Sequence, residues 1–577
     1  MRSYPAANVH LYNCGASNDQ PVLLLLLCET RASIEPVHPN TLIHNTTHRL
    51  TTMPHDETWT IRKPAVESNG GIVTAQHHMA ARAGSDVLAR GGNAVDAAIT
   101  TAFALAAVEP WMSGLGGCGF MVVHLASEKR TFALEFGVKA PLALDPADYP
   151  LSGGYDSDLF AWPGVLENRN VLGPKSVAVP GFVAGMAEAA AQFASFKWND
   201  LLSAAVELAE TGLRVDWYSS LKIASVARDI DRFAATRSIY LPDGFVPVGE
   251  WSGPAPVIQL NGLANTLRRL ANEGPDSFYS GPLAADLLAD AQSVGIGILA
   301  DDLTAYRPRC TEISGFGYRG AKVFSPPGLC AGLTLQEALT SLQSLMPTSS
   351  ATPDANTYVH YANSMQAAYE HRLQAVGDSP DGKSPSCTTH LNVIDRQGNV
   401  VALTQTLLSL FGSKVVLPET GILMNNGIMW FDPRPGRANS IAAGKQPLSN
   451  MCPAIVQESD GSRFTLGASG GRRIMSAVLQ LISFLVDFSM DPESAMHQPR
   501  IDVSGNHEVD FDTRLEPETA SQLLKRLDHA LPTSHGVFPS LFACPGLARF
   551  DAKTRRCTGA SFVYSPLAAA IAENRID

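Results

Sequence analysis

One short stretch of the sequence gathers residue types that could carry out nucleophilic chemistry. It reads "SPSCTTHLNVIDRQGNVVALTQT" and runs from Ser384 to Thr406. The pattern predicts a loop of small residues, a strand, a tight turn and a second strand. A strand that only fills a core would carry Val or Ile where two threonines and a histidine stand. A hydroxyl at the start of this strand is therefore a candidate nucleophile.

The expected hairpin gives the hydroxyl groups a geometry. A turn centred on Gln397, in the polar run "DRQGN", places Thr388 opposite Thr406 and His390 opposite Thr404. Hydroxyl groups then gather at the open end of the hairpin, directly after "SPSC".

A lone threonine is a poor nucleophile, because nothing nearby takes its proton. If the chain is cut before Thr388, its own α-amino group, with an unperturbed pKa of about 7.7–8.0, lies beside Oγ1 and can act as the base. Thr406 would then orient the attacking oxygen, and the N–H groups of Gly470 and Gly471 would form an oxyanion hole. On spacing alone, two threonines with strand propensity remain the simpler interpretation.

A second candidate nucleophile lies in "GASGG", residues 467–471, which matches the nucleophile-elbow pattern G-x-S-x-G. An expected strand precedes it and an expected helix follows, as an elbow at Ser469 requires. The alternative is a glycine turn whose N–H groups point into a site at a helix N-terminus. Histidines that could serve Ser469 follow in the chain: His497, His507, His529 and His535.

Dinucleotide and metal sites are not indicated. "GLGGCG", residues 114–119, matches G-x-G-x-x-G, but here a helix precedes the motif and a strand follows, the reverse of what pyrophosphate binding needs. A tight backbone turn is the better interpretation. No H-E-x-x-H motif and no ligand cluster with metal-binding spacing occurs, so we expect neither a metal nor a cofactor.

Composition limits the partners. The 577 residues are 45% hydrophobic and carry a net charge of −12, which argues against nucleic acid or an anionic membrane as the main partner. The nine cysteines are scattered and include no C-x-x-C motif, so isolated thiols are expected rather than a disulfide framework. No apolar run is long enough to span a bilayer.

The first 55 residues are polar and weakly patterned, so we expect a poorly ordered N-terminal extension. "PVLLLLLC", residues 21–28, resembles the apolar part of a secretion signal, but it lies late and only Arg2 precedes it as a positive charge. The compartment stays open, with the cytoplasm favoured over secretion.

The rest of the chain alternates expected helices and strands. Residues 77–110 predict two helices broken at Gly91-Gly92, followed by strands at residues 120–126 and 130–136. Further helical stretches are expected at residues 198–213, 263–274, 333–345 and 358–373. Near the C-terminus come a strand before "GASGG", a long apolar helix and a strand pair at residues 546–562. The pattern favours an α/β or α+β fold with helices packed on a substantial mixed sheet.

Many motifs, in a consistent order, resemble those of the γ-glutamyltransferases, which are autoprocessing N-terminal-nucleophile hydrolases. The resemblance runs from about residue 70 to residue 562. The motifs are "GGNAVDAA", "GLGGCGFMV", "VPGFVAG", "GPDSFYSG", "TTHLNVIDRQGNVVALTQT", "GILMNN", "PLSNMCPAIV" and "GASGGRRI".

The resemblance implies an α+β fold, a four-layer αββα sandwich built from two subunits of one precursor. The cut would fall between Cys387 and Thr388, giving a large subunit, residues 56–387 after the extension, and a small subunit, residues 388–577, which form a heterodimer. Thr388 would be the nucleophile, Thr406 its partner, and Gly470 and Gly471 the oxyanion hole, with Ser469 only a turn residue. The implied substrate contacts are Ser449, Asn450, Asn426 and Trp430.

Departures from the family's pattern concern the substrate. Gly137, in "LEFGVKAP", stands where typical members carry an arginine that grips the α-carboxylate of the γ-glutamyl group. Trp430 stands at about the position of the aspartate that holds the α-amino group, and Gly427 and Leu408 replace usual polar residues. The pattern is similar to a divergent branch that includes oxamate amidohydrolase and cephalosporin acylases.

The sequence thus predicts an amidohydrolase or acyltransferase that cleaves γ-glutamyl or related acyl amides through a Thr388 acyl-enzyme. Glutathione or its conjugates are the default substrate, and water or an amine is the acceptor. The alternatives are a serine hydrolase that uses Ser469 and a family scaffold without activity.

Overall fold

The computed structural model describes residues 61–155, 162–250, 252–344, 351–376, 387–504, 508–535 and 541–574. Residues 61–577 form a single compact unit. The expected N-terminal extension, residues 1–55, lies outside the described residues.

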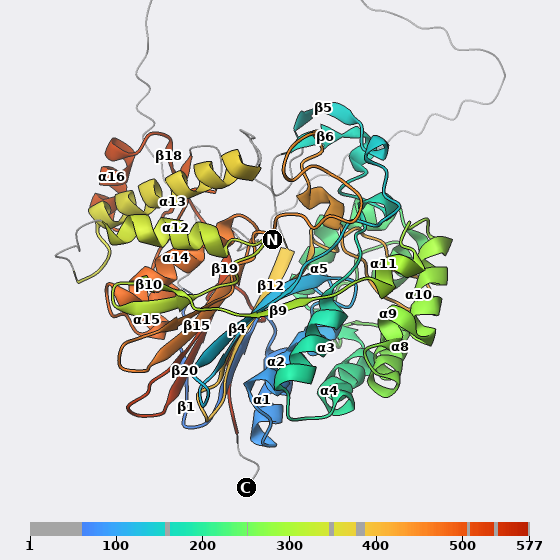
Figure 1. Cartoon of the computed structure of the whole chain (residues 1–577), viewed down its shortest axis with the longest axis horizontal. Coiled ribbons are helices and arrows are strands. Elements are labelled where there is room, and N and C mark those ends of the chain that lie inside the picture. The colour runs from blue at the N-terminus through green and yellow to red at the C-terminus, as the bar shows by residue number, and fades with distance from the viewer. Residues whose placement is uncertain are drawn as a thin grey trace, which may run out of the picture. The chain divides into compact units, whose positions relative to one another are not determined.

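Two antiparallel seven-stranded sheets form the centre of this unit (Figure 1). Sheet 1 has the order β21 (Ala569–Ala572), β2 (Ile72–Ala75), β12 (Cys387–Ile394), β13 (Val400–Leu408), β3 (Cys118–Leu125), β4 (Arg130–Phe136) and β9 (Arg309–Glu312). Sheet 2 has the order β1 (Val66–Ser68), β20 (Cys557–Ser561), β19 (Cys544–Phe550), β15 (Arg463–Ser469), β14 (Ala454–Gln457), β11 (Ala321–Phe324) and β10 (Phe316–Tyr318).

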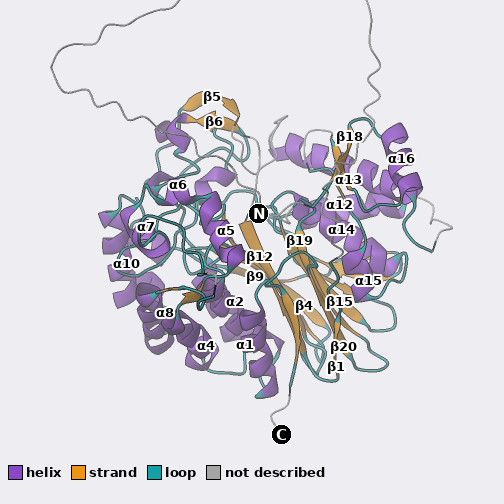
Figure 2. Cartoon of the chain, turned by 180° about the vertical axis from the view of Figure 1, so that it is seen from behind, coloured by secondary structure: helices purple, strands orange, loops and turns teal. Residues whose placement is uncertain are grey.

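Helices cover the outer face of each sheet (Figure 2). On sheet 1 lie α1 (His78–Ala89), α2 (Ala94–Val108) and α3 (Phe182–Phe193), and α4 (Trp198–Thr211) and α8 (Asn261–Glu273) pack outside α2. On sheet 2 lie α12 (Gly332–Gln343), α14 (Arg473–Val486) and α15 (Pro492–His497), while α13 (Ala355–Val376) packs on α12 and α16 (Pro517–Arg526) packs on α13.

Smaller elements complete the unit. The short helices are α5 (Trp217–Ser225), α6 (Ala227–Ile230), α7 (Ala234–Tyr240), α9 (Ser277–Ser280), α10 (Pro282–Ser293) and α11 (Ala300–Thr304). The minor sheets pair β5 (Leu151–Tyr155) with β6 (Pro163–Val165), β7 (Leu213–Arg214) with β8 (Val257–Ile258), and β17 (Val509–Asp512) with β16 (Ile501–Asp502) and β18 (Ala530–Thr533).

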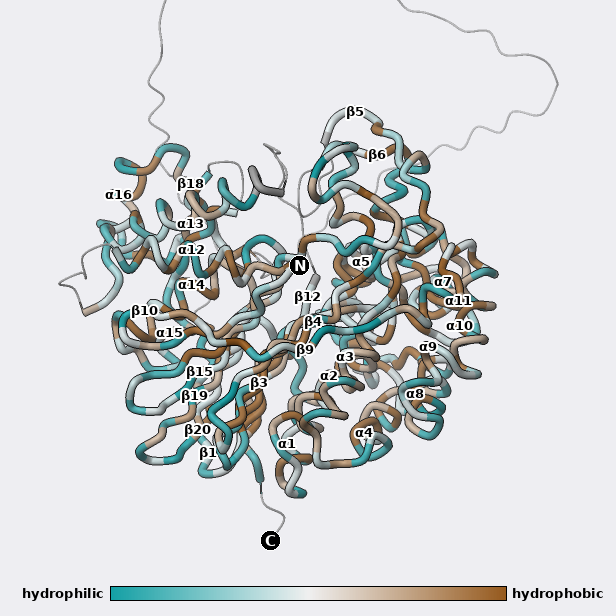
Figure 3. Tube along the Cα trace, viewed as in Figure 1, coloured by the Kyte–Doolittle hydropathy of each residue, from teal (hydrophilic) through white to brown (hydrophobic). Residues whose placement is uncertain are grey.

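Apolar side chains fill the space between each pair of layers. The core between the two sheets contains Ile72, Val122, Ile394, Ile455 and Phe550. α2 is buried along its whole length and is apolar on all sides, as a helix between a sheet and an outer helix must be. The outer helices α4 and α8 alternate instead between apolar and polar residues (Figure 3).

Most elements expected from sequence are present. The break at Gly91-Gly92 separates α1 from α2, and α2 begins with a capping box in which Asn93 accepts from the Asp96 N–H and the Asp96 carboxylate accepts from the Asn93 N–H. "GLGGCG" forms the expected turn, in which the Gly117 N–H donates to the Gly114 carbonyl. The expectation of an α+β fold is confirmed, but the expected mixed sheet is wrong: the structure has two large sheets, and both are antiparallel. Six described cysteines are free thiols, as expected.

Candidate active site

The hairpin of β12 and β13 has the predicted register. His390 pairs with Thr404 and Thr389 with Gln405, and an irregularity in the pairing falls between Cys387 and Thr389. Thr388 Oγ1 donates to Thr406 Oγ1 across the two strands at 3.4 Å. Both threonines are buried, at 3% and 0% exposure. The structure therefore brings the two predicted hydroxyl groups together at the start of β12.

The turn of this hairpin is fixed by Asp395. Its carboxylate accepts from the N–H groups of Gln397 and Asn399, and its second oxygen accepts from the Ala94 N–H at 3.0 Å. The same side chain therefore closes the turn and joins the hairpin to the first turn of α2.

Below Thr388, a buried polar network joins the two sheets. The His390 imidazole bonds to Thr404 Oγ1 through Nδ1 and to Asn392 Oδ1 through Nε2, both at 2.9 Å. Thr465, on β15, donates to the same Asn392 oxygen at 2.9 Å. Because Asn392 Oδ1 can only accept, His390 Nε2 carries the proton and Nδ1 accepts. Burial lowers the His390 pKa to about 4, so this ring is neutral at pH 7.

This network also aligns β12 with β15. Asn392 lies opposite Thr465, and the His390 ring lies against Gly467, where an added Cβ would be 2.6 Å from its Nδ1 atom. Extending this alignment by two residues along each strand leads to the expectation that Thr388 lies near Ser469. The glycine pair Gly470-Gly471 follows directly.

Gly470 and Gly471 make the turn between β15 and α14 with φ angles of 141° and 60°, a region that favours glycine. Among the described residues, none accepts a hydrogen bond from their N–H groups. Two donors at the start of a helix, opposite the candidate nucleophile, suit a developing oxyanion.

Thr406 is held from the following turn. The Leu408 N–H donates to Thr406 Oγ1 at 2.8 Å, and Leu408 itself adopts a φ of 84°. This left-handed backbone is strained for leucine, at a cost of roughly 1–3 kcal/mol. The strained residue lies two positions beyond Thr406.

The geometry gives Ser469 no base. It is 2% exposed and lies opposite Cys544 on β19. No described histidine bonds to it: His497 bonds to Glu493, and His535 bonds to Asp512. His507 lies outside the described residues.

The loop before β14 carries Ser449 and Asn450, both buried. Ser449 Oγ accepts from the Met451 N–H at 3.2 Å. Arg372, from α13, donates to the Ser449 carbonyl at 2.6 Å and to Asn450 Oδ1 at 3.4 Å. The helix that precedes the expected cut therefore braces the expected substrate loop.

Asn426 and Trp430 lie on the segment after "GILM". The Asn426 amide accepts from the Ser409 N–H and donates to Ser409 Oγ and to the Val171 carbonyl, so its hydrogen bonds hold this segment against the end of β13. Trp430, in the short helix Gly427–Trp430, is 3% exposed and its indole N–H has no acceptor among the described residues.

Gly137 and Gly427, which stand where the resembling family usually carries other residues, differ in their surroundings. At Gly137 an added Cβ would have only Phe120 Cζ within 4 Å, at 3.8 Å, so a side chain has room there. At Gly427 it would be 2.6 Å from Ala178 Cβ, so the usual polar residue does not fit.

Sequence reasoning missed Glu109, the last residue before Pro110 at the end of α2. Its carboxyl is 4% exposed and lies near the Thr389 hydroxyl, next in sequence to the candidate nucleophile. Burial raises the Glu109 pKa to about 7, although the Thr389 hydroxyl and the Lys222 ammonium favour the charged form. A glutamate before proline carried no signal that would have linked it to residue 389.

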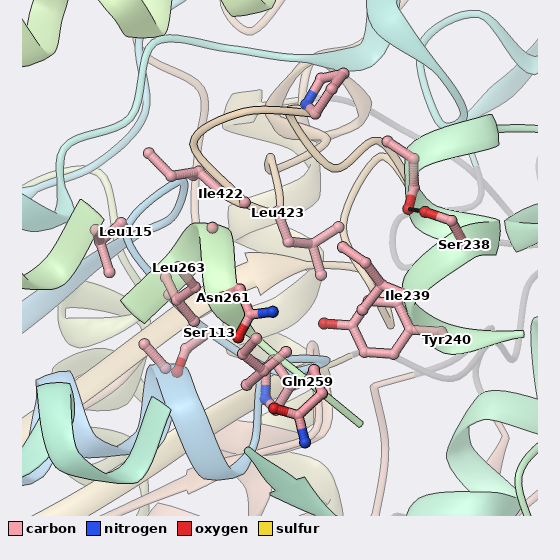
Figure 4. A pocket seen from close by; sticks show the side chains of 18 residues that line it. Ser113, Leu115, Ser238, Ile239, Tyr240, Gln259, Asn261, Leu263, Ile422 and Leu423 are labelled. Carbon is pink, nitrogen blue, oxygen red and sulfur yellow. Dashed lines mark hydrogen bonds between the residues drawn. The ribbon is translucent and has the colours of Figure 1, made fainter. Parts of the chain in front are cut away.

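A separate cavity of about 300 Å³ lies on the helical side of sheet 1 (Figure 4). Ser113, Tyr240, Gln259 and Asn261 line it together with leucine and isoleucine side chains. None of the predicted site residues does so.

Comparisons with known proteins decide the family. The Gamma-glutamyltranspeptidase family model matches residues 80–387 and 379–541. The chain belongs to the γ-glutamyltranspeptidase family. Family membership makes it an enzyme of the N-terminal-nucleophile hydrolase class.

Similar proteins are named either as acylases or as glutathione hydrolases. The chain is 32% identical over 513 residues to the Acylase ACY 1 proenzyme of Pseudomonas sp. (strain SE83), covering 82% of this chain and 89% of the relative. It is 28% identical over 517 residues to the Glutathione hydrolase proenzyme of Bacillus subtilis (strain 168), covering 80% and 86%.

Solved structures support the same fold. The crystal structure of cephalosporin acylase from Bacillus halodurans superposes with a TM-score of 0.76 at 24% identity, covering 91% of this chain and 99% of that one. None of the helices in the described part of the chain is long and apolar enough to cross a membrane.

Proposed function

We propose that this γ-glutamyltranspeptidase-family protein is a proenzyme that cuts itself between Cys387 and Thr388 and then works as an amidohydrolase or acyltransferase. The product is an αββα sandwich of two subunits, residues 56–387 and residues 388–577. The observation that carries the proposal is the position of Thr388, whose hydroxyl donates to the Thr406 hydroxyl at 3.4 Å at the start of β12.

Self-cleavage uses these groups and water. Thr388 Oγ1 attacks the carbonyl carbon of Cys387, the peptide C–N bond breaks, and the Oγ1 proton passes to the departing nitrogen, which becomes the new α-amino group. Water then hydrolyses the resulting ester, which leaves a carboxylate on Cys387 and restores the Thr388 hydroxyl.

Turnover repeats the same attack on an external amide. The α-amino group accepts the Oγ1 proton as the bond to the substrate carbonyl forms, and returns it to the departing amine. The N–H groups of Gly470 and Gly471 stabilise the tetrahedral oxyanion. Water or a second amine then resolves the acyl ester on Thr388. Thr406 positions the attacking oxygen throughout.

The acyl group is a γ-glutamyl group or a related one. Relatives named glutathione hydrolase make glutathione or its conjugates the default substrate, and relatives named acylase point to other acyl groups. Typical family members hold a free amino acid head group with an arginine and an aspartate. Gly137 and Trp430 stand at about those two positions here, so neither charged side chain is present there, which favours a related acyl group.

A denaturing gel with N-terminal sequencing tests the proposal. We expect two bands, the smaller beginning Thr-Thr-His-Leu, and a single band for Thr388→Ala. Ser469→Ala should still be cut, since no described histidine bonds to Ser469. An intact chain that is fully active would refute the mechanism, and a cut chain with no turnover on any amide would favour an inactive scaffold.

A further inference from the structure

The cavity on the helical side of sheet 1 has the size of a ligand site, and the proposed chemistry does not use it (Figure 4). Its volume of about 300 Å³ lies at the lower end of the range that is usual for small-molecule sites. An apolar cavity of about 150 Å³ takes benzene, so this cavity has room for a molecule of roughly ten to twelve non-hydrogen atoms.

The cavity and the candidate nucleophile lie on opposite faces of β13. Ser113 lines the cavity, and its hydroxyl oxygen accepts from Gln405 Nε2 at 2.9 Å. Gln405 also donates to the Ala102 carbonyl of α2 at 3.1 Å, so its side chain faces the helical layer. Because side chains alternate along a strand, the next residue, Thr406, faces the other sheet. The cavity is therefore separate from the site of the proposed chemistry.

One buried hydroxyl group points into the cavity. Tyr240 is 3% exposed, and Figure 4 shows its hydroxyl directed toward the Asn261 side chain. The hydroxyl has no hydrogen-bond partner among the described residues. Burial raises the pKa of this phenol above its ordinary value, so the group stays protonated and can donate. A buried donor without a partner is unfavourable, and a ligand that brings an acceptor would remove that cost.

A helix begins at the same wall of the cavity. Helix α8 starts at Asn261, and the preceding Leu260 makes no side-chain capping bond. The first hydrogen bond of the helix runs from the Ala264 N–H to the Leu260 carbonyl. The N–H groups of Asn261 and Gly262, which both line the cavity, have no acceptor in the part of the chain that the structure describes. Free N–H groups at a helix start attract an oxygen acceptor.

The wall of the cavity carries no charged side chain. It is formed by 18 described residues, and none of them is Asp, Glu, Lys, Arg or His. Much of the remaining surface is aliphatic, from Leu115, Leu263, Ile422 and Leu423. An ion would lose its hydration here without meeting an opposite full charge, since a helix start supplies only a partial one. The wall therefore fits an apolar body with one uncharged acceptor.

We propose that this cavity is a second ligand site, which takes an uncharged molecule with an apolar body and one carbonyl oxygen. The carbonyl oxygen accepts from the Tyr240 hydroxyl at the start of α8. The apolar body contacts Leu263 and Leu423. Binding does not use Thr388, so this site is independent of self-cleavage and turnover.

Three probes of similar size test the class of ligand. 4-Phenylbutan-2-one carries an uncharged carbonyl, 3-phenylpropanoate has a carboxylate of the same shape in its place, and 3-phenylpropylammonium is a cation without an acceptor. Isothermal titration calorimetry with the uncut Thr388→Ala chain measures binding without turnover. The ketone should bind at least about tenfold more tightly than either ion, because only the ions lose full charge hydration. Tighter binding of an ion, or no saturable binding of the ketone, would overturn the inference.

Two variants locate the bound ketone. Tyr240→Phe removes only the hydroxyl donor and should raise the Kd about fivefold to tenfold. Ala235, on α7, also lines the cavity, so Ala235→Phe fills it and should abolish binding. If the Kd were unchanged in both variants, the ketone would bind elsewhere and the inference would be wrong.

Tyr358→Phe is the matched control. The Tyr358 hydroxyl donates to the Pro499 carbonyl at 2.7 Å, and the residue packs in the core on the sheet 2 side, away from the cavity. This variant should leave the Kd of the ketone unchanged. Tyr240→Phe should keep the urea midpoint of the parent chain, because its hydroxyl has no bond to lose. A lower midpoint would show that the hydroxyl is already bonded, which would contradict its role as a free donor.

Failure of this inference is distinguishable from failure of the proposed function. A native chain that stays uncut while Thr388→Ala binds the ketone would refute the proposed function and support the second site. A processed, active enzyme that binds no ketone would refute only the second site.

Discussion

Two threonine hydroxyls face each other at the start of β12, and each is constrained from a different direction. Thr388 Oγ1 donates to Thr406 Oγ1 at 3.4 Å, and Thr406 Oγ1 accepts from the Leu408 N–H at 2.8 Å. Neither hydrogen bond supplies a base, so the proposed turnover depends on the amine that cleavage would release.

Removal of the Thr406 hydroxyl should slow both cleavage and turnover. We expect Thr406→Ala to lower kcat about 10–100-fold, since a misplaced Oγ1 loses orientation while the nucleophile remains. Thr406→Ser keeps the hydroxyl and should stay within about fivefold of the native enzyme. Steady-state kinetics and the band ratio on a gel measure the two effects. An equal loss of kcat in Thr406→Ala and Thr406→Ser would show that the threonine methyl group matters and the hydroxyl does not.

Glu109 should make stability depend on pH. Its pKa is raised to about 7 in the folded protein, against 4.5 ordinarily, so the folded state binds more protons between these values. The free energy of unfolding therefore falls as pH rises from 4.5 to 7, by about 3 kcal/mol. Glu109→Gln removes this pH-dependent loss of stability. The substitution should therefore raise the free energy of unfolding more at pH 8 than at pH 4.

Urea unfolding at both pH values, in the uncut Thr388→Ala background, measures this difference on a single chain. If the Glu109→Gln substitution changed the free energy of unfolding by the same amount at pH 4 and at pH 8, the assignment would be contradicted.

At the scale of elements, the closest contact between the sheets is the His390 ring against Gly467. Strand β15 can approach β12 so closely because residue 467 has no side chain. The distance between β15 and β12 in turn affects where the Gly470-Gly471 turn lies relative to Thr388.

Gly467→Ala should therefore damage both stability and processing. The new Cβ would lie 2.6 Å from His390 Nδ1 and 2.8 Å from Nε2, so the ring must move and lose its bond to Thr404. We expect a loss of about 1–3 kcal/mol and slower cleavage. Gly297→Ala, where no atom lies within 4 Å of the added Cβ, is the control. A shift in urea midpoint no larger than the control's would contradict the role of this contact.

At the scale of the whole molecule, strands from both sides of residue 387 alternate within each sheet. In sheet 1, β2 from the N-terminal side lies between β21 and β12 from the C-terminal side. In sheet 2, β1 lies at one edge and β11 and β10 at the other, around four C-terminal strands. Cleavage between residues 387 and 388 would therefore break one peptide bond, separate Cys387, which pairs with Leu408, from the rest of β12, and leave the pairs from Thr389 onward in place.

The two proposed subunits should consequently stay together after cleavage. Size-exclusion chromatography in native buffer should give one peak near the chain mass of 61.5 kDa, and only denaturant should separate the fragments. A dilution series provides the control for weak association. Release of the smaller fragment in native buffer would contradict the interleaved arrangement.

The sequence by itself determined the local structure and the chemistry that local structure permits. The polar turn fixed the register that brings Thr388 to Thr406, because hairpin pairing depends only on neighbours in the chain. The glycine break between α1 and α2 and the strand–turn–helix at Gly470 followed from local propensity in the same way.

Only the tertiary structure decided which distant residues share the site. Glu109 near Thr389, Arg372 against Asn450 and His390 against Gly467 join segments that no periodicity relates. It also decided that the strands form two sheets and that no described histidine bonds to Ser469. Burial, charge and approach distance are properties of packing between layers, and a linear pattern of residue types does not contain them.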